Sequence, residues 1–121
     1  MSLSGGERQK VWIAMVLAQK TSVLLLDEPT TYLDICHQYE IMELIRELNK
    51  KLGITIVMVL HDLNQASQYS DRVLVLRDGK KYIEGEVKRV LTKELVREIY
   101  RVESEVEYYN GVPYFKLRGL A

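Results

Sequence analysis

The sequence is poor in cysteine, and its charges cancel. Its single cysteine, Cys36, excludes an intrachain disulfide and favours a reducing compartment. Cys36 and its neighbour His37 are too few for a closed zinc site, which needs about four ligands, so we expect both on an ordinary helix face. Seventeen basic residues balance seventeen acidic ones, and no run of like charge is long enough to attract nucleic acid or an anionic lipid surface. We therefore expect no nucleic-acid partner.

Long apolar runs are also absent, and we expect no export signal. The most apolar stretch, Ile54–Leu60, has seven residues, far below the roughly 18 residues that are needed to span a bilayer. The opening stretch, MSLSGGERQ, is too polar for a signal peptide. With 47% hydrophobic and 28% charged residues among 121, the composition is typical of one soluble globular domain.

What the chain does have at its start is a helix N-terminus that can bind an anion. Ser4 and Glu7 have the spacing of a capping box, and strong helix formers follow to about Gln19. Gly5 and Gly6 let a ligand approach the backbone, where unpaired N–H groups and the helix dipole favour a phosphate. Taken alone, the same residues also fit a simple helix cap with a flexible entry.

Two short apolar runs predict strands of a parallel sheet. Val23–Leu26 has no polar residue and fits a strand that is covered on both faces. A helix capped by Asp34 and stopped by Gly53 follows, and it leads into the second strand, Ile54–Leu60. Strand, helix and strand over this length predict a βαβ crossover.

Polar residues with catalytic potential follow both strands. Asp27 and Glu28 come directly after the first strand, and His61 follows the second. Adjacent carboxylates repel each other unless they are separated or bridged by a cation, which favours a metal site, and an imidazole can donate to a phosphate. An ordinary strand end with a polar turn, and a structural histidine, are the plainer alternatives.

The rest of the chain predicts two hairpins and a helix. Asp78-Gly79 and Asn110-Gly111 are two-residue hairpin signals between apolar segments, and Thr92–Tyr100 fits a capped helix. We expect one domain over residues 1–85 and a small helix-plus-hairpin appendage over residues 86–121.

Taken together and in this order, the motifs resemble the ATP-binding cassette (ABC) ATPases. LSGGE at Leu3–Glu7 resembles the family signature motif, and VLLLDEP at Val23–Pro29 resembles the Walker B strand with its glutamate. Thr31–Asp34 is similar to the D-loop, and His61 to the switch-loop histidine. EPTTYLD and HDLNQASQYSDRVLVLRDGK look most like the subunits that energise bacterial import of iron-siderophore, haem or cobalamin complexes.

The resemblance implies an α/β fold and a role for each motif. The fold would be part of a P-loop NTPase domain, with a mostly parallel sheet, flanking helices, a C-terminal hairpin and a small α+β tail. In the family, two nucleotide-binding domains sandwich ATP, and the signature motif serves nucleotide that is bound to the partner. The resemblance implies that Ser4, Gly5 and Gly6 contact the γ-phosphate in trans. It implies that Asp27 holds Mg²⁺ and that Glu28 is the general base. By the same resemblance, His61 binds the γ-phosphate and Asp34 touches the opposite protomer.

Three features of the family are missing. No G-x-x-x-x-G-K-S/T occurs, and the Gly79-Lys80 pair is followed by Lys81 in a predicted turn. The adenine-stacking aromatic residue and the glutamine loop, which precede the signature motif in the family, are missing too. We therefore expect the C-terminal half of a nucleotide-binding domain, which by itself neither binds ATP tightly nor hydrolyses it.

Partners and location follow from the same resemblance. We expect a second nucleotide-binding domain, transmembrane permease subunits reached through the missing half, and a cytoplasmic, peripheral position at the inner face of the plasma membrane. Apolar strands without cover also predict self-association. Two alternatives stay open: a non-catalytic module that supplies the signature motif to a separate Walker A chain, and a non-transport ABC ATPase. The short spacing between signature and Walker B and the lack of coiled-coil heptads weaken the second alternative.

Overall fold

The computed structural model describes residues 5–121, which form two compact units. The first unit ends at His61 and the second begins at Asp62.

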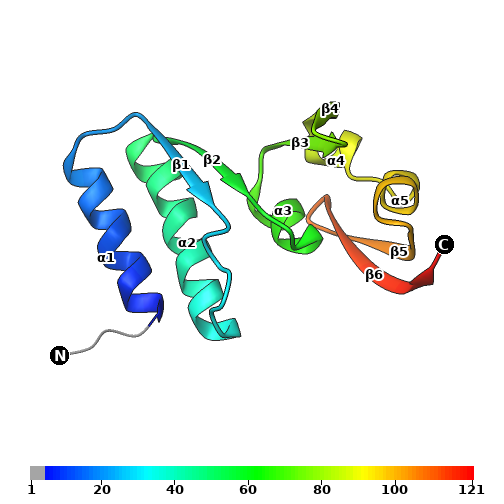
Figure 1. The fold of residues 1–121 in the computed structure, drawn as a ribbon, viewed down its shortest axis with the longest axis horizontal. Helices are drawn as coiled ribbons and strands as arrows, with labels where there is room; N and C mark the ends of the chain where they lie inside the picture. The colour runs from blue at the N-terminus through cyan, green and yellow to red at the C-terminus, as the bar shows by residue number, and fades with distance from the viewer. Residues whose placement is uncertain (1–4) are drawn as a thin grey trace. The chain divides into compact units, whose positions relative to one another are not determined.

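The first unit is a βαβ motif preceded by a helix (Figure 1). Its elements are α1 (Gly5–Ala18), β1 (Val23–Asp27), α2 (Ile35–Leu52) and β2 (Thr55–Val59). The two strands are parallel, with a register that runs from Val23 opposite Thr55 to Asp27 opposite Val59. The predicted βαβ order and parallel pairing are therefore confirmed.

Only one face of this strand pair is covered among the described residues. Burial alternates along β1, where Leu24 and Leu26 are buried and Leu25 is 70% exposed. Val57 and Val59 of β2 are also exposed. The prediction of strands covered on both faces is wrong for these residues, because α2 buries its apolar side chains on one side only.

Helix α2 begins and ends where the sequence predicts. The Asp34 side chain caps it by accepting a hydrogen bond from the His37 N–H at 2.9 Å. Gly53 ends it in the left-handed conformation (φ 67°), which glycine adopts without a steric penalty, and its N–H donates to the Asn49 carbonyl at 3.0 Å. The buried face consists of Ile41, Met42, Ile45 and Leu48.

The second unit combines a short helix with two hairpins and a helical segment (Figure 1). Its elements are α3 (Leu63–Tyr69), β3 (Arg72–Arg77), β4 (Lys80–Glu86), α4 (Val87–Val90), α5 (Lys93–Leu95), the π-helix η1 (Val96–Tyr100), β5 (Val102–Tyr109) and β6 (Val112–Leu120). The sequence predicts one helix over Thr92–Tyr100, where the structure has a short α-helical turn followed by the π-helix. Helix α4 was not expected.

Both predicted hairpins are present, and their turns have the expected geometry. Asp78 and Gly79 have φ values of 53° and 73°, and Asn110 and Gly111 have 52° and 80°. Two successive positive φ values are what a type I′ turn requires, which is why Asp-Gly and Asn-Gly favour it.

The core of the second unit is shared by the segments before and after residue 85. Its buried members are Val87, Val90, Leu91, Leu95, Val96 and Phe115. Val73, Val75 and Ile83 of the first hairpin pack against them. The expected domain boundary at residue 85 thus falls inside one hydrophobic core, which holds the β3–β4 hairpin to the appendage.

Within residues 5–121, none of the helices has the length and the apolar composition that a membrane crossing needs.

Candidate catalytic site

The carboxyl ends of the two parallel strands bring three predicted site residues to one edge. Asp27 is the last residue of β1 and lies opposite Val59 of β2. The Glu28 N–H continues the ladder by donating to the Val59 carbonyl at 3.0 Å. His61 stands two residues beyond Val59, so the register of the parallel pair brings it near Glu28.

Glu28 and His61 contact each other directly. His61 Nε2 and Glu28 Oε1 form an ion-pair contact. The Glu28 side chain is 35% exposed and the His61 side chain 79% exposed, so the pair sits at the surface, where a ligand can reach it. A carboxylate oriented by an imidazole is an arrangement that can accept a proton from a water molecule.

The backbone at Glu28 is in an unusual conformation. Its φ is 49°, which places a non-glycine residue in the left-handed region. The turn that follows is closed by hydrogen bonds from the Thr31 N–H to the Glu28 carbonyl at 3.2 Å and from the Leu33 N–H to the Thr30 carbonyl at 3.3 Å. Such strain concentrates at functional sites, where the surrounding structure holds it in place. No local sequence signal predicts it.

Asp34 is committed to the start of α2. Its Oδ1 accepts from the His37 N–H and lies 3.0 Å from His37 Nδ1. The backbone hydrogen bond from His37 lowers the pKa of Asp34 below its ordinary value. The structure thus gives Asp34 a capping role, and the contact with an opposite protomer stays a prediction. His37, which the sequence placed on an ordinary helix face, is the partner of this cap.

The glycine pair lies at the start of a helix, as predicted. Gly5 and Gly6 are the first two residues of α1. Ser4 and the capping box that it would form lie outside the described residues.

The described residues do not complete a magnesium site. Asp27 is exposed at the strand end and can supply one carboxylate ligand. Over residues 5–121, no group of three histidine, cysteine, aspartate or glutamate side chains is placed to hold a metal ion. Magnesium requires octahedral oxygen coordination, which the Asp27 carboxylate alone does not supply.

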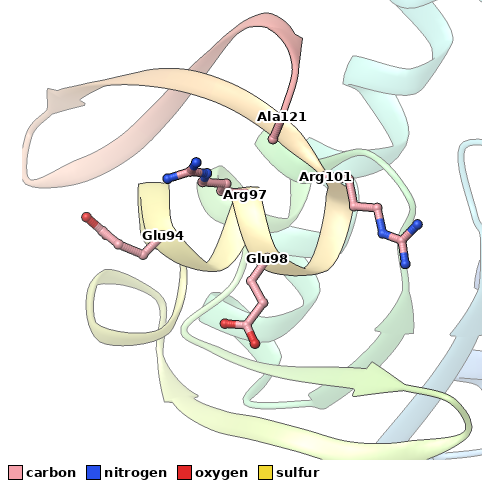
Figure 2. Close-up of a pocket in the computed structure, with 5 residues that line it drawn as sticks. All are labelled: Glu94, Arg97, Glu98, Arg101 and Ala121. Atoms are coloured by element: carbon pink, nitrogen blue, oxygen red, sulfur yellow. The ribbon is translucent and has the colours of Figure 1, made fainter.

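Two hollows of the surface are lined by other residues. One, of about 420 Å³, lies in the second unit and is lined by Glu94, Arg97, Glu98, Arg101 and Ala121 (Figure 2). Its charges are partly neutralised, because Arg97 pairs with Glu103 at 2.9 Å and Glu98 with Arg77 at 3.4 Å. The other, of about 600 Å³, lies between α1 and α2. There the Lys10 ammonium meets the Glu40 carboxylate at 2.5 Å.

The fold and the order of the motifs are similar to those of ATP-binding cassette proteins. A family model described as ABC transporter matches residues 1–31. The chain belongs to the ATP-binding proteins of ABC transporters, and within them it resembles those of siderophore importers.

Two curated relatives and one solved structure illustrate the similarity. The petrobactin import ATP-binding protein FpuC of Bacillus anthracis is 57% identical over 114 residues, which are 94% of this chain and 42% of the relative. The ferric enterobactin transport ATP-binding protein FepC of Escherichia coli K12 is 54% identical over 99 residues, which are 82% of this chain and 36% of the relative. A metal-chelate type ABC transporter, solved in an inward-facing conformation, superimposes with a TM-score of 0.85 at 28% identity, over 96% of this chain and 48% of the solved one. The chain therefore spans less than half the length of the relatives that it matches.

Proposed function

We propose that the chain carries the signature and Walker B part of the ATPase site of an importer for iron-siderophore, haem or cobalamin complexes. The observation that supports this most directly is the contact between Glu28 and His61 at the shared edge of β1 and β2. The names of the relatives support the substrate class, since FepC is a ferric enterobactin transport protein. The solved structure that superimposes over 96% of this chain belongs to a metal-chelate transporter.

The chemistry of the site follows from the roles of its residues. Glu28 takes the proton of the attacking water, and His61 orients the Glu28 carboxylate and lies within reach of a γ-phosphate. Asp27 would supply one carboxylate ligand to Mg²⁺, and the ion would neutralise phosphate charge. Ser4, Gly5 and Gly6 present the start of α1 to ATP that is held by a second nucleotide-binding domain. Asp34 contacts that second domain through the D-loop.

Transport requires further partners. We place the protein at the inner face of the plasma membrane, where transmembrane permease subunits hold it as a peripheral cytoplasmic subunit. ATP hydrolysis between two such domains would then drive passage of the chelate through the permease.

A chimeric importer ATPase tests this proposal. Residues 1–121 replace the matching segment of FpuC, which is 57% identical to this chain over 114 residues, and ATP turnover is measured with Mg²⁺. We expect the chimera to hydrolyse ATP and Glu28→Gln to lower kcat by about 10²- to 10⁴-fold, the range for loss of a general base. The 121-residue chain alone should show no turnover.

Glu47→Gln is the matched control, because Glu47 is an exposed glutamate on α2. It should leave kcat unchanged. A chimera whose kcat survives Glu28→Gln would refute the proposed role of the site.

A further inference from the structure

The loop between β1 and α2 begins with Glu28, and a side chain of α2 holds its other end. Gln38 lies in the first turn of α2, where its N–H donates to the Asp34 carbonyl at 2.9 Å. Its side-chain Nε2 donates to the Leu33 carbonyl at 2.8 Å. Gln38 and Leu33 are both partly buried. Gln38 therefore joins the helix to the backbone of the loop, and all of these residues belong to the first unit.

Hydrogen bonds lead from Leu33 back to Glu28. The Leu33 N–H donates to the Thr30 carbonyl at 3.3 Å, and the Thr31 N–H donates to the Glu28 carbonyl at 3.2 Å. Pro29 and Thr30 are buried. Both backbone groups of Leu33 are thus bonded, so a shift of the loop at Leu33 breaks hydrogen bonds at a partly buried position.

The loop has to hold Glu28, because the local backbone chemistry opposes the conformation that Glu28 adopts. Its φ of 49° is unfavourable for a residue with a Cβ. A residue that precedes a proline is also biased towards the extended region, and Pro29 follows Glu28. Such a conformation persists only where the surrounding structure imposes it. A released Glu28 would return to negative φ, and its carboxylate would leave His61.

Helix α2 carries an equivalent bond at its other end. Asn49 Nδ2 donates to the Ile54 carbonyl at 2.8 Å. Like the Gln38 bond, it joins a side-chain amide to a backbone carbonyl five residues further along the chain. Ile54 directly precedes β2, and the register places that end of the strand pair opposite to the end that carries Glu28. Asn49 therefore offers the same chemistry without a connection to Glu28.

We propose that Gln38 is a positioning residue for Glu28: by holding the Leu33 carbonyl, it keeps the loop in the form that directs the Glu28 carboxylate to its place beside His61. This inference rests on the proposed function, in which Glu28 takes the proton of the attacking water. Gln38 acts through the backbone of Leu33 and Thr30, and it makes the first turn of α2 part of the support of the site.

Turnover by the chimeric importer ATPase tests the positioning. Gln38→Met keeps the length of the side chain and loses the N–H donor. We expect kcat to fall about 10- to 100-fold, because a misplaced general base is less effective, while KM for ATP stays within about twofold. Asn49→Leu loses the equivalent bond at the far end of α2 and should change kcat by less than about twofold. Equal losses of kcat in the two variants would overturn the proposal.

A double variant separates positioning from a general loss of stability. In a Glu28→Gln background, Gln38→Met should have little further effect on kcat, since both changes act on one group. If the two losses multiply, Gln38 acts on something other than Glu28 and the positioning role is excluded.

Hydrogen exchange in the 121-residue chain reports on the loop without any nucleotide. Gln38→Met should speed exchange of the Thr31 and Leu33 amides about fivefold, the effect of losing one hydrogen bond. Asn49→Leu should leave both amides as in the unmodified chain. Unchanged exchange of these amides in Gln38→Met would contradict the proposal.

The two proposals fail in different ways. If kcat survives Glu28→Gln, the proposed function is wrong, and faster exchange of the loop in Gln38→Met still stands. If Glu28→Gln lowers kcat as expected but Gln38→Met only speeds exchange, Gln38 is a structural residue and the positioning role is wrong.

Discussion

Glu28 combines the chemistry of a general base with a backbone that a glutamate rarely adopts. Its φ of 49° costs free energy for any residue with a Cβ. The sequence predicts Glu28 and His61 as two separate site residues, because each lies close after an apolar strand. Their direct contact depends on strand register, which no short stretch of sequence encodes.

The left-handed backbone at Glu28 predicts that glycine destabilises the fold less than alanine does at this position. Glu28→Gly should be more stable than Glu28→Ala by about 1 kcal/mol in the free energy of unfolding, because glycine adopts positive φ without strain. The comparison is made by urea denaturation of the 121-residue chain. At Glu47, inside helix α2, the order should reverse by about 1 kcal/mol, because glycine weakens a helix interior. The same order at both positions would contradict the strain at Glu28.

Helix α2 shows how far local signals determine an element. Asp34 at its start and Gly53 at its end were both predicted, because capping depends on residues within one turn. Ile35 and Leu52 are apolar residues at its two ends, yet Ile35 is 84% exposed and Leu52 is 63% exposed. Burial of a helix end depends on what lies beyond it, so periodicity alone overestimates the core.

The contribution of the Asp34 cap to the free energy of unfolding should depend on pH. Because the pKa of Asp34 is lowered in the folded state, its ionised form stabilises the fold at neutral pH. That contribution disappears as the pH falls through the ordinary aspartate range, below about 4. Asp34→Asn keeps a capping acceptor but loses the charge, so it should be less stable than the unmodified chain at pH 7. This gap in stability between the two proteins should disappear in acid.

Thermal unfolding between pH 7 and pH 3 measures this gap. Asp34→Ala should be the least stable variant at neutral pH, since it also lacks the acceptor for the His37 N–H. Glu47→Gln, in the body of α2, should show no comparable closing. A gap between Asp34→Asn and the unmodified chain that stays constant with pH would exclude the charge effect.

For the whole molecule, the uncovered face of the first unit has the clearest consequence. Val23, Leu25, Val57 and Val59 expose apolar surface on two paired strands. Apolar surface of this kind drives association. We expect the purified chain to self-associate at micromolar concentration.

Leu25→Lys should weaken this association, because it places a charge in the middle of the exposed face. Light scattering gives the mass, and Leu52→Lys is the control, since Leu52 is also an exposed leucine but lies at the end of α2. A monomer for the unmodified chain would contradict the prediction, as would equal effects of the two lysine substitutions.

The sequence by itself determined most of the elements, though not α4 or the π-helix η1, and it determined the chemistry of their ends. Caps, Asp-Gly and Asn-Gly turns and apolar runs act over a few residues, so their signals survive in the linear chain. Tertiary structure alone decided which face of β1 and β2 is covered and that Glu28 meets His61. These features join residues that are distant in the sequence, and they depend on the packing of whole elements, to which local preferences contribute little.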